Sequence, residues 1–315
     1  MGNTYFKRSL PVPSDSFFLF GPRGTGKSSW IADNFKTPGL AIDLLDEEEF
    51  LAYASDPGLL GRRLESLPPK AWVVIDEVQR LPSLLNTVHR GIEKQKLRFV
   101  LSGSSARKLR KKGVNLLGGR AIECQMHPFT PFELGGDFSL EDQLQFGSLP
   151  VAFRSEERKR RLLSYVQTYL SQEIQRESAV KRLPSFVRFL SVAALCHGQT
   201  LNLSNLARDT GVARSTVQGY LEILEDSLMV FYVDAFRPKL RVKEVAHPKF
   251  YWFDSGVLRA VKRNLSPVIA EERGALFEGW VAQTLRAQQA YRETFDDLTY
   301  WSTHDGGPRV EVDFL

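Results

Sequence analysis

Cysteine and histidine are scarce in this sequence, which has two cysteines and five histidines among 315 residues. Cys124 and Cys196 do not form a C-x-x-C motif, so a disulfide framework is excluded as the basis of the fold. Two reduced thiols are what a cytoplasmic protein is expected to have. The histidines show none of the spacings with which proteins ligate zinc, and we expect no structural zinc site.

Long apolar segments are also absent. No run approaches the ~18 residues that are needed to cross a bilayer. The first four residues, Met-Gly-Asn-Thr, are polar and lack the apolar centre of a secretory signal peptide. We therefore expect a soluble, cytoplasmic protein without a membrane partner.

The overall composition is ordinary for a globular protein, with 43% hydrophobic and 25% charged residues. A chain of 315 residues has room for two or more domains, each with its own core. The formal net charge is +5, and basic residues gather in runs such as 107–112 and 158–161. Such runs are most often solvated faces, and they also permit contact with nucleic acid or nucleotide phosphates.

The most informative stretch follows four apolar residues, Phe-Phe-Leu-Phe at positions 17–20. It has the spacing Gly21-x-x-x-x-Gly26-Lys27-Ser28 of a phosphate-binding P-loop. A helix that starts near Lys27 directs its backbone N–H groups and the positive end of its dipole at an anion. We predict that Lys27 contacts the β- and γ-phosphates of ATP and that Ser28 ligates Mg²⁺. The predicted nucleotide-binding residues are Gly21, Pro22, Arg23, Gly24, Thr25, Gly26, Lys27, Ser28 and Ser29.

A second apolar run, residues 71–75, ends in two acids, Asp76 and Glu77. A buried parallel strand delivers such acids to the carboxyl edge of its sheet, where ligands bind. We predict that Asp76 holds Mg²⁺ opposite Ser28 and that Glu77 is the base that activates the attacking water. The alternative is two solvated acids at an exposed strand end. An adjacent pair of acids favours hydrolysis over transfer to a small acceptor.

A third strand is expected over residues 97–101, and it runs into serines at positions 102, 104 and 105. A hydroxyl at this edge could contact the γ-phosphate or the attacking water. Ser104, or else Ser102, is therefore a candidate phosphate sensor. A loop of turn-forming serines is the equally open alternative.

Several of these motifs together resemble AAA+-superfamily ATPases of the prokaryotic clade related to archaeal ATPases. The resemblance covers nearly the whole chain. It is carried by residues 21–28, 75–79, 101–105, 118–120, 128–133, 147–150, 247–256 and 274–278.

The resemblance implies an α/β fold with a P-loop parallel-sheet core over residues 1–135. A helical, lid-like region (136–198), a winged helix (199–262) and a partial restriction-endonuclease-like α/β segment (263–315) would follow. Arg120 matches the position of the arginine finger that completes a neighbour's site, which implies a homo-oligomer. A surface arginine beside a turn is the alternative.

Residues 203–224 have helix-turn-helix spacing, with Gly211 at the turn. On the second helix, the side chains that could contact phosphates or bases are Arg214, Ser215, Thr216 and Gln218. Acidic residues near the end of that helix oppose DNA. A DNA partner and a pure domain interface therefore stay equally open, as does a protein partner.

Glu278 and Asp313 match two acidic positions that restriction-endonuclease-like folds use to hold Mg²⁺. The lysine expected just after the second acid is absent, because the sequence stops there. We expect a truncated nuclease-like segment without nuclease activity.

The sequence as a whole predicts a Mg²⁺-dependent ATPase whose ATP/ADP cycle moves the winged-helix and C-terminal regions. The alternative is a nucleotide-gated module that binds DNA or protein and hydrolyses ATP slowly. A small-molecule kinase is a poorer third reading.

Overall fold

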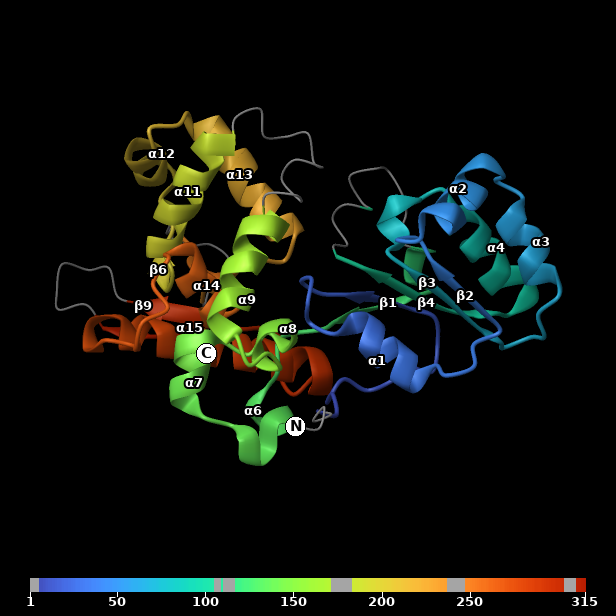
Figure 1. Ribbon diagram of the computed structural model, residues 1–315, viewed down its shortest axis with the longest axis horizontal. Coiled ribbons are helices and arrows are strands. Elements are labelled where there is room, and N and C mark those ends of the chain that lie inside the picture. Colours follow the sequence, from blue (N-terminus) through green and yellow to red (C-terminus); the bar gives the residue numbers. More distant parts are fainter. Residues whose placement is uncertain (1–5, 105–108, 110–116, 171–182, 237–246, 303–309) are drawn as a thin grey trace. The chain divides into compact units, whose positions relative to one another are not determined.

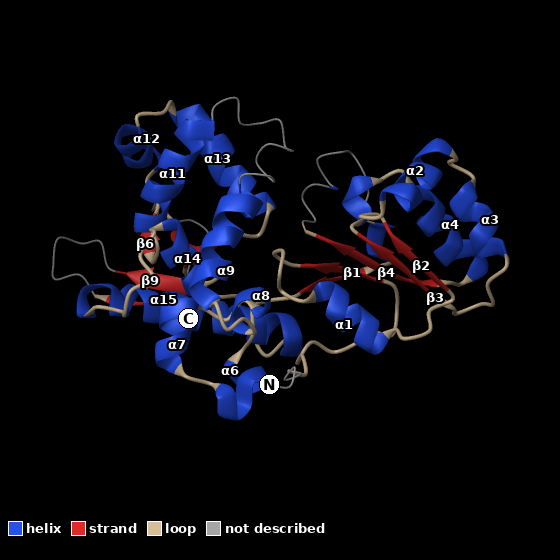
Figure 2. Ribbon diagram, in the orientation of Figure 1, coloured by secondary structure: helices blue, strands red, loops and turns tan. Residues whose placement is uncertain are grey.

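The computed structural model describes residues 6–104, 109, 117–170, 183–236, 247–302 and 310–315. The chain forms two compact units by internal contacts. One unit comprises Arg8–Met126, and the other comprises His127–Leu315 together with Met1–Lys7. Figure 1 colours both units by position in the sequence, and Figure 2 colours them by helix, strand and loop.

The unit of residues 8–126 is built on a five-stranded sheet in the order β2-β3-β4-β1-β5. All of its strand pairs are parallel. The strands are β1 (Phe17–Phe20), β2 (Leu40–Asp43), β3 (Trp72–Asp76), β4 (Arg98–Gly103) and β5 (Ile122–Gln125). The predicted parallel α/β core is thereby confirmed.

Helices cover both faces of this sheet, as the direction of the chain requires. The connection from β1 to β2 crosses the sheet one way, while those from β2 to β3 and from β3 to β4 return the other way. Because such crossovers are right-handed, helices on the outward and return paths lie on opposite faces. Figure 1 shows α1 on one side and the other three α-helices on the opposite side. The helices are α1 (Lys27–Asn34), α2 (Glu47–Ser55), α3 (Leu59–Glu65) and α4 (Leu84–Gln95), with short 3₁₀ segments η1 (Val78–Arg80) and η2 (Leu117–Gly119).

The central strands are apolar on both faces because helices cover both. Every residue of β1 is buried, as are Val73, Val74 and Ile75 of β3. Continuous apolar runs of this kind are typical of buried parallel strands. The apolar run 17–20 is therefore a fully buried strand, and its carboxyl end carries the phosphate loop.

The second unit has a mixed sheet in the order β10-β9-β7-β8-β6. The pair β7–β8 is antiparallel, whereas β7 and β9 are parallel. Its strands are β6 (Gln199–Thr200), β7 (Val230–Ala235), β8 (Lys249–Trp252), β9 (Thr299–Ser302) and β10 (Glu311–Val312). Strand pairing thus joins β7 and β8 to β6 on one side and to β9 and β10 on the other.

Helices of this unit pack around an apolar core that includes Phe186, Phe189, Leu224 and Trp252. They are α6 (Pro131–Leu134), η3 (Gly135–Asp137), α7 (Leu140–Phe146), α8 (Pro150–Phe153), α9 (Arg158–Ser164), the π-helix η4 (Tyr165–Leu170), α11 (Leu183–Leu195), α12 (Leu203–Thr210), α13 (Arg214–Asp226), α14 (Ser255–Val261) and α15 (Ala270–Arg292). Within the described part of the chain, no helix is both long enough and apolar enough to span a membrane.

The helices α12 and α13 meet at Gly211, which ends α12 in the left-handed conformation with φ 66°. Glycine adopts that conformation without a steric penalty, so the chain can turn sharply here. Leu206, Val217 and Leu221 are buried between the helices and their surroundings. The basic residues within 237–246 and the basic run 107–112 lie outside the described residues, apart from Leu109.

Candidate nucleotide site

The phosphate loop connects β1 to α1 over residues 21–26. Gly26 caps the amino end of α1 with φ 90°, and Gly24 has φ 82°. Residues with a Cβ rarely adopt these angles, so glycine is needed at both positions for the loop to close. Gly21 is needed for a different reason, since a Cβ there would lie 2.5 Å from the carbonyl oxygen of Met126.

The Lys27 side chain lies against the loop that precedes it. Its ammonium group donates to the carbonyl oxygens of Gly21 and Pro22, over 2.8 and 3.2 Å. Lys27 is 6% exposed. A buried cation held by loop carbonyls is well placed to attract an anion to this loop.

Two further hydrogen bonds fix the shape of the loop. The Thr25 hydroxyl donates to the carbonyl oxygen of Pro22 over 2.8 Å. Arg8, from the segment before β1, donates to the carbonyl oxygen of Thr25 over 2.6 Å. Arg23 of the loop and Ser28 and Ser29 of the first turn of α1 are exposed.

Ser28 and Asp76 are in direct contact. The Ser28 hydroxyl donates to Oδ2 of Asp76 over 2.8 Å, and the buried Ser102 hydroxyl donates to Oδ1 of the same carboxylate. These oxygens come from the start of α1 and the carboxyl ends of β3 and β4. Residues that lie far apart in the sequence therefore meet at one edge of the sheet.

The chemistry of this oxygen set fits Mg²⁺. The ion prefers oxygen ligands and is usually held by one or two carboxylates together with water and substrate phosphates. Among the described residues no cluster of three or more His, Cys, Asp or Glu is arranged to hold a metal. A site with one carboxylate and a hydroxyl, completed by a nucleotide, is compatible with that finding.

Glu77 has an unusual backbone conformation, with φ 56° and ψ 42°. Its N–H donates to Oδ1 of Asp76 over 3.0 Å and to the Ser102 hydroxyl over 3.3 Å. Its carboxylate accepts a hydrogen bond from Nε2 of Gln79. The main chain of Glu77 is thus held by the side chains of Asp76 and Ser102, which also contact each other.

Gln79 also contacts Ser104. Its Nε2 donates to the Ser104 hydroxyl over 3.3 Å, and Ser104 is 6% exposed. No role was predicted for Gln79 from the sequence, although it contacts two residues, Glu77 and Ser104, for which one was predicted. The available signal was its position two residues after the acid pair, on the same short turn.

Arg120 lies just before β5, and its contacts are of another kind. Its Nε donates to Oε1 of Glu93, and one of its terminal nitrogens donates to the carbonyl oxygen of Gly118 over 3.3 Å. The hydrogen bond from Arg120 lowers the pKa of the Glu93 carboxyl. The Arg120 side chain is 40% exposed. These contacts do not bring it to Ser28 or Asp76.

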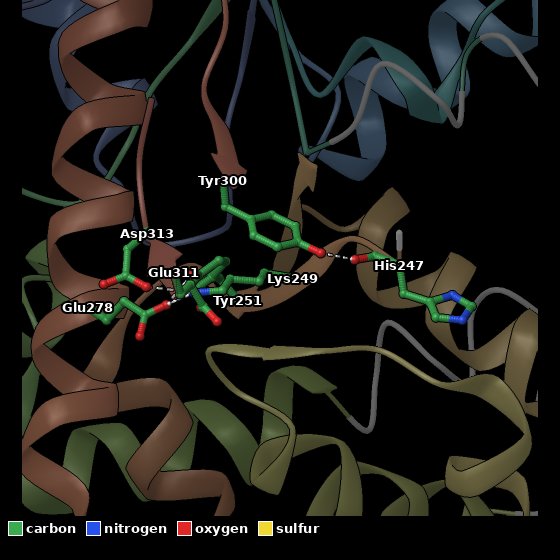
Figure 3. A network of polar contacts seen from close by, with 7 residues as sticks. All are labelled: His247, Lys249, Tyr251, Glu278, Tyr300, Glu311 and Asp313. Atoms are coloured by element: carbon green, nitrogen blue, oxygen red, sulfur yellow. Dashed lines mark hydrogen bonds and ion pairs between the residues drawn. The ribbon is translucent and has the colours of Figure 1, made fainter. Parts of the chain in front are cut away.

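The acids singled out near the carboxyl end of the chain, Glu278 and Asp313, meet a lysine from another strand. The Lys249 ammonium donates to Oε1 of Glu278 over 2.8 Å and to Oδ1 of Asp313 over 2.7 Å, and it also pairs with Glu311. Tyr251 donates to Glu278 over 2.5 Å. Figure 3 shows these side chains converging.

The lysine beside these acids comes from a different strand. The sequence has no lysine after Asp313, and the structure brings Lys249 of β8 to the acids instead. Lys249 is 2% exposed and compensates the charge of the carboxylates around it.

Two family models match this chain. Residues 14–134 match an AAA domain, and residues 137–267 match a domain of unknown function, DUF8612. The AAA match covers β1 to β5 and every residue of the predicted site.

Similar proteins include two from mycobacteria and one from an archaeon. Uncharacterized proteins Rv2008c of Mycobacterium tuberculosis and Mb2031c of Mycobacterium bovis are each 27% identical over 90% of this chain. The chain spans 64% of the length of these two relatives. Uncharacterized protein MJ1544 of Methanocaldococcus jannaschii is 20% identical over 96% of this chain and 72% of its own length.

Among solved structures, the DNA clamp loader delta protein of Bacillus subtilis is similar over 86% of this chain and 95% of its own. The sequence identity is 13% and the TM-score is 0.29. The family match to residues 14–134 and the parallel sheet together support an AAA-type, nucleotide-binding P-loop ATPase core in this part of the chain.

Proposed function

We propose that this protein hydrolyses ATP with Mg²⁺ at the phosphate loop. The observation that carries the proposal is the contact between Ser28 and Asp76, beside a loop that holds the buried cation of Lys27. A hydroxyl and a carboxylate at this spacing, next to a phosphate loop, are the protein ligands that nucleotide-bound Mg²⁺ requires. When bound, Mg²⁺ would neutralise negative charge on the phosphate oxygens.

The proposed reaction is the attack of water on the γ-phosphorus, with cleavage of its bond to the bridging oxygen of ADP. Lys27 exchanges loop carbonyls for phosphate oxygens and stabilises their charge. Glu77 orients the water and accepts its proton. Ser104 contacts the γ-phosphate and reports its presence.

Two substitutions test the proposal. Lys27→Ala should abolish ATP and ADP binding, whereas Glu77→Gln should bind ATP and lose turnover by at least about a hundredfold. Lys94→Ala and Glu65→Gln replace exposed residues of the same unit and serve as matched controls. Equal turnover by the wild type and Glu77→Gln would overturn the assignment of the base.

We propose further that a second copy supplies Arg120 to this site. Its partial exposure supports the proposal, since a neighbour could reach it. In that case specific activity rises with protein concentration, and Arg120→Ala removes the rise. Glu93→Gln is the control, because it breaks the same ion pair and keeps the arginine. Activity that stays flat on dilution contradicts a role in trans.

The proposed purpose of hydrolysis is to move the regions that follow the core. The core (1–135), helical region (136–198), winged helix (199–262) and nuclease-like segment (263–315) remain our proposed division, and a cytoplasmic location goes with it. We also keep the prediction of no nuclease activity. The chain spans 64% of the length of its mycobacterial relatives, so these proposals concern only the residues of this chain.

A second candidate function is nucleotide-gated binding of DNA or a protein, with slow hydrolysis. Four exposed polar residues at the start of α13 favour it: Arg214, Ser215, Thr216 and Gln218. Binding to a duplex that weakens steeply with salt and falls in Arg214→Ala would support DNA. Absence of duplex binding at low salt, with and without ATP, would exclude it.

A further inference from the structure

We propose that Gln79 is a positioning residue of the ATPase site, which couples the base Glu77 to the phosphate-facing hydroxyl of Ser104. The proposal rests on the proposed function above and adds to it a residue that decides where the base lies. Gln79 sits on η1, the single turn that follows the acid pair.

The contacts of the Gln79 amide form a bridge. Its Nε2 donates both to Oε2 of Glu77 and to the Ser104 hydroxyl, the latter over 3.3 Å. An amide nitrogen has two N–H bonds, so one can serve each partner. The bridge therefore spans from the end of β3 to the end of β4.

Chemistry fixes the orientation of this amide. An ionised carboxylate only accepts hydrogen bonds, so the nitrogen and not the oxygen of the amide must face Glu77. The oxygen then points at β4, and a Cβ at Gly103 would lie 2.4 Å from it. Glycine at position 103 is what leaves room for the amide in this orientation.

The position of the amide oxygen is not explained by a hydrogen bond of its own. Within the described residues, Oε1 of Gln79 is buried and has no hydrogen-bond partner. Buried acceptors are normally paired, and an exception calls for an explanation. The explanation here is that the two contacts of Nε2, to Glu77 and Ser104, set the position of the whole group.

The backbone of Glu77 makes this control of the side chain effective. Asp76 and Ser102 hold the Glu77 N–H, in a left-handed conformation that residues other than glycine seldom adopt. With the main chain held in this way, the contact with Gln79 orients the carboxylate. A phosphate that draws the Ser104 hydroxyl to itself thereby alters the restraint on the base.

The experiment compares Gln79→Leu with the wild type by nucleotide affinity and by steady-state kinetics with Mg²⁺ and ATP. We expect kcat to fall by about tenfold to a hundredfold, with ATP and ADP affinity changed by less than about threefold. A residue that only stabilised the fold would lower both together. Gln95→Leu is the matched control, since Gln95 also has a buried, unpaired amide oxygen and lies on α4 of the same unit.

A double-mutant cycle with Ser104→Ala tests the coupling itself. If Gln79 acts through Ser104 and Glu77, the double variant loses less activity than the product of the two single losses. Gln79→Glu keeps the size of the side chain and replaces the donor, so it carries the same test if Gln79→Leu does not fold. Its kcat should fall as in Gln79→Leu.

The outcomes separate the two proposals. A wild type that binds nucleotide and hydrolyses it, with Gln79→Leu and Gln79→Glu matching it in kcat, overturns the role of Gln79 alone. Multiplicative losses in the cycle overturn the coupling to Ser104. A wild type that does not hydrolyse ATP overturns the proposed function and the role of Gln79 with it.

Discussion

The Ser28 hydroxyl donates to Oδ2 of Asp76 over 2.8 Å, although the two residues are 48 positions apart in the sequence. One belongs to the first turn of α1 and the other ends β3. The contact occurs because the parallel strands β1 and β3, with β4 between them, bring their carboxyl ends to one edge of the sheet.

Asp76→Asn keeps the size of the side chain and removes its charge. We expect Mg²⁺-dependent turnover to fall by at least about a hundredfold, while metal-free ADP binding changes by less than about threefold, since the carboxylate is proposed to face the cation. Turnover measured against Mg²⁺ concentration checks this. Asp43→Asn is the control, because Asp43 stands opposite Asp76 in the register of β2 and β3. An equal loss in both variants would contradict the assignment.

Gly21→Ala introduces a Cβ that would lie 2.5 Å from the carbonyl oxygen of Met126. The loop must shift to relieve this contact, so we expect weaker ATP binding and a loss of about 1–3 kcal/mol in the free energy of unfolding. Nucleotide titration and thermal unfolding measure the two effects. Gly61→Ala in α3 is the control, because nothing lies within 4 Å of its Cβ position. Normal binding in Gly21→Ala would show that the loop tolerates displacement.

Lys249→Met removes the cation that three carboxylates share. We expect the second unit to lose about 3 kcal/mol of stability, at the low end for buried pairs because Asp313 is 50% exposed. Denaturant unfolding of this unit measures the loss, with exposed Lys159→Met as the control.

Adding Glu278→Gln to Lys249→Met should recover part of the loss, because it removes one of the uncompensated charges. A loss below about 1 kcal/mol in Lys249→Met, or no recovery in the double variant, would show that the cluster is not a net source of stability.

The buried carboxyl of Asp254 should make the free energy of unfolding depend on pH. Burial raises the pKa of its carboxyl to about 6, from 3.8, although hydrogen bonds from the backbone N–H groups of Val257 and Ser148 oppose the rise. A raised pKa in the folded state means that the stabilisation is full below about pH 4 and is lost as the pH rises through about 6. The loss amounts to roughly 3 kcal/mol, since each pKa unit corresponds to about 1.4 kcal/mol.

The comparison of wild type and Asp254→Asn isolates this term. Burial lowers the pKa of His197 to about 3, which makes stability fall as the pH drops below about 6.5 and so opposes the effect of Asp254. The difference between the unfolding free energies of the two proteins should therefore be followed from pH 4 to 8. A difference that is independent of pH would refute the contribution of Asp254.

Local patterns were sufficient to predict the parallel core. Residues 17–20 and 71–75 are continuous apolar runs, which are typical of strands covered on both faces. The glycines that follow the first run determine the loop. The helix-turn-helix spacing around Gly211 is matched by α12 and α13, while the winged helix itself stays a prediction.

The mixed sheet could not be predicted in the same way. Its edge strands β6 and β10 have two residues each, too few to show an alternating pattern. The pairing of β7 with β9 is parallel and joins segments more than sixty residues apart in the sequence. Long-range pairing of this kind depends on what else each strand can pack against, which no local window contains.

The sequence by itself determined the phosphate loop, because glycine spacing, an apolar strand and a following helix are local properties. Only the tertiary structure decided which side chains meet: Ser28 with Asp76, Gln79 with Glu77 and Ser104, and Lys249 with Glu278 and Asp313. Hydrogen bonds act over about 3 Å, so their partners are chosen by strand order and register, not by distance along the chain.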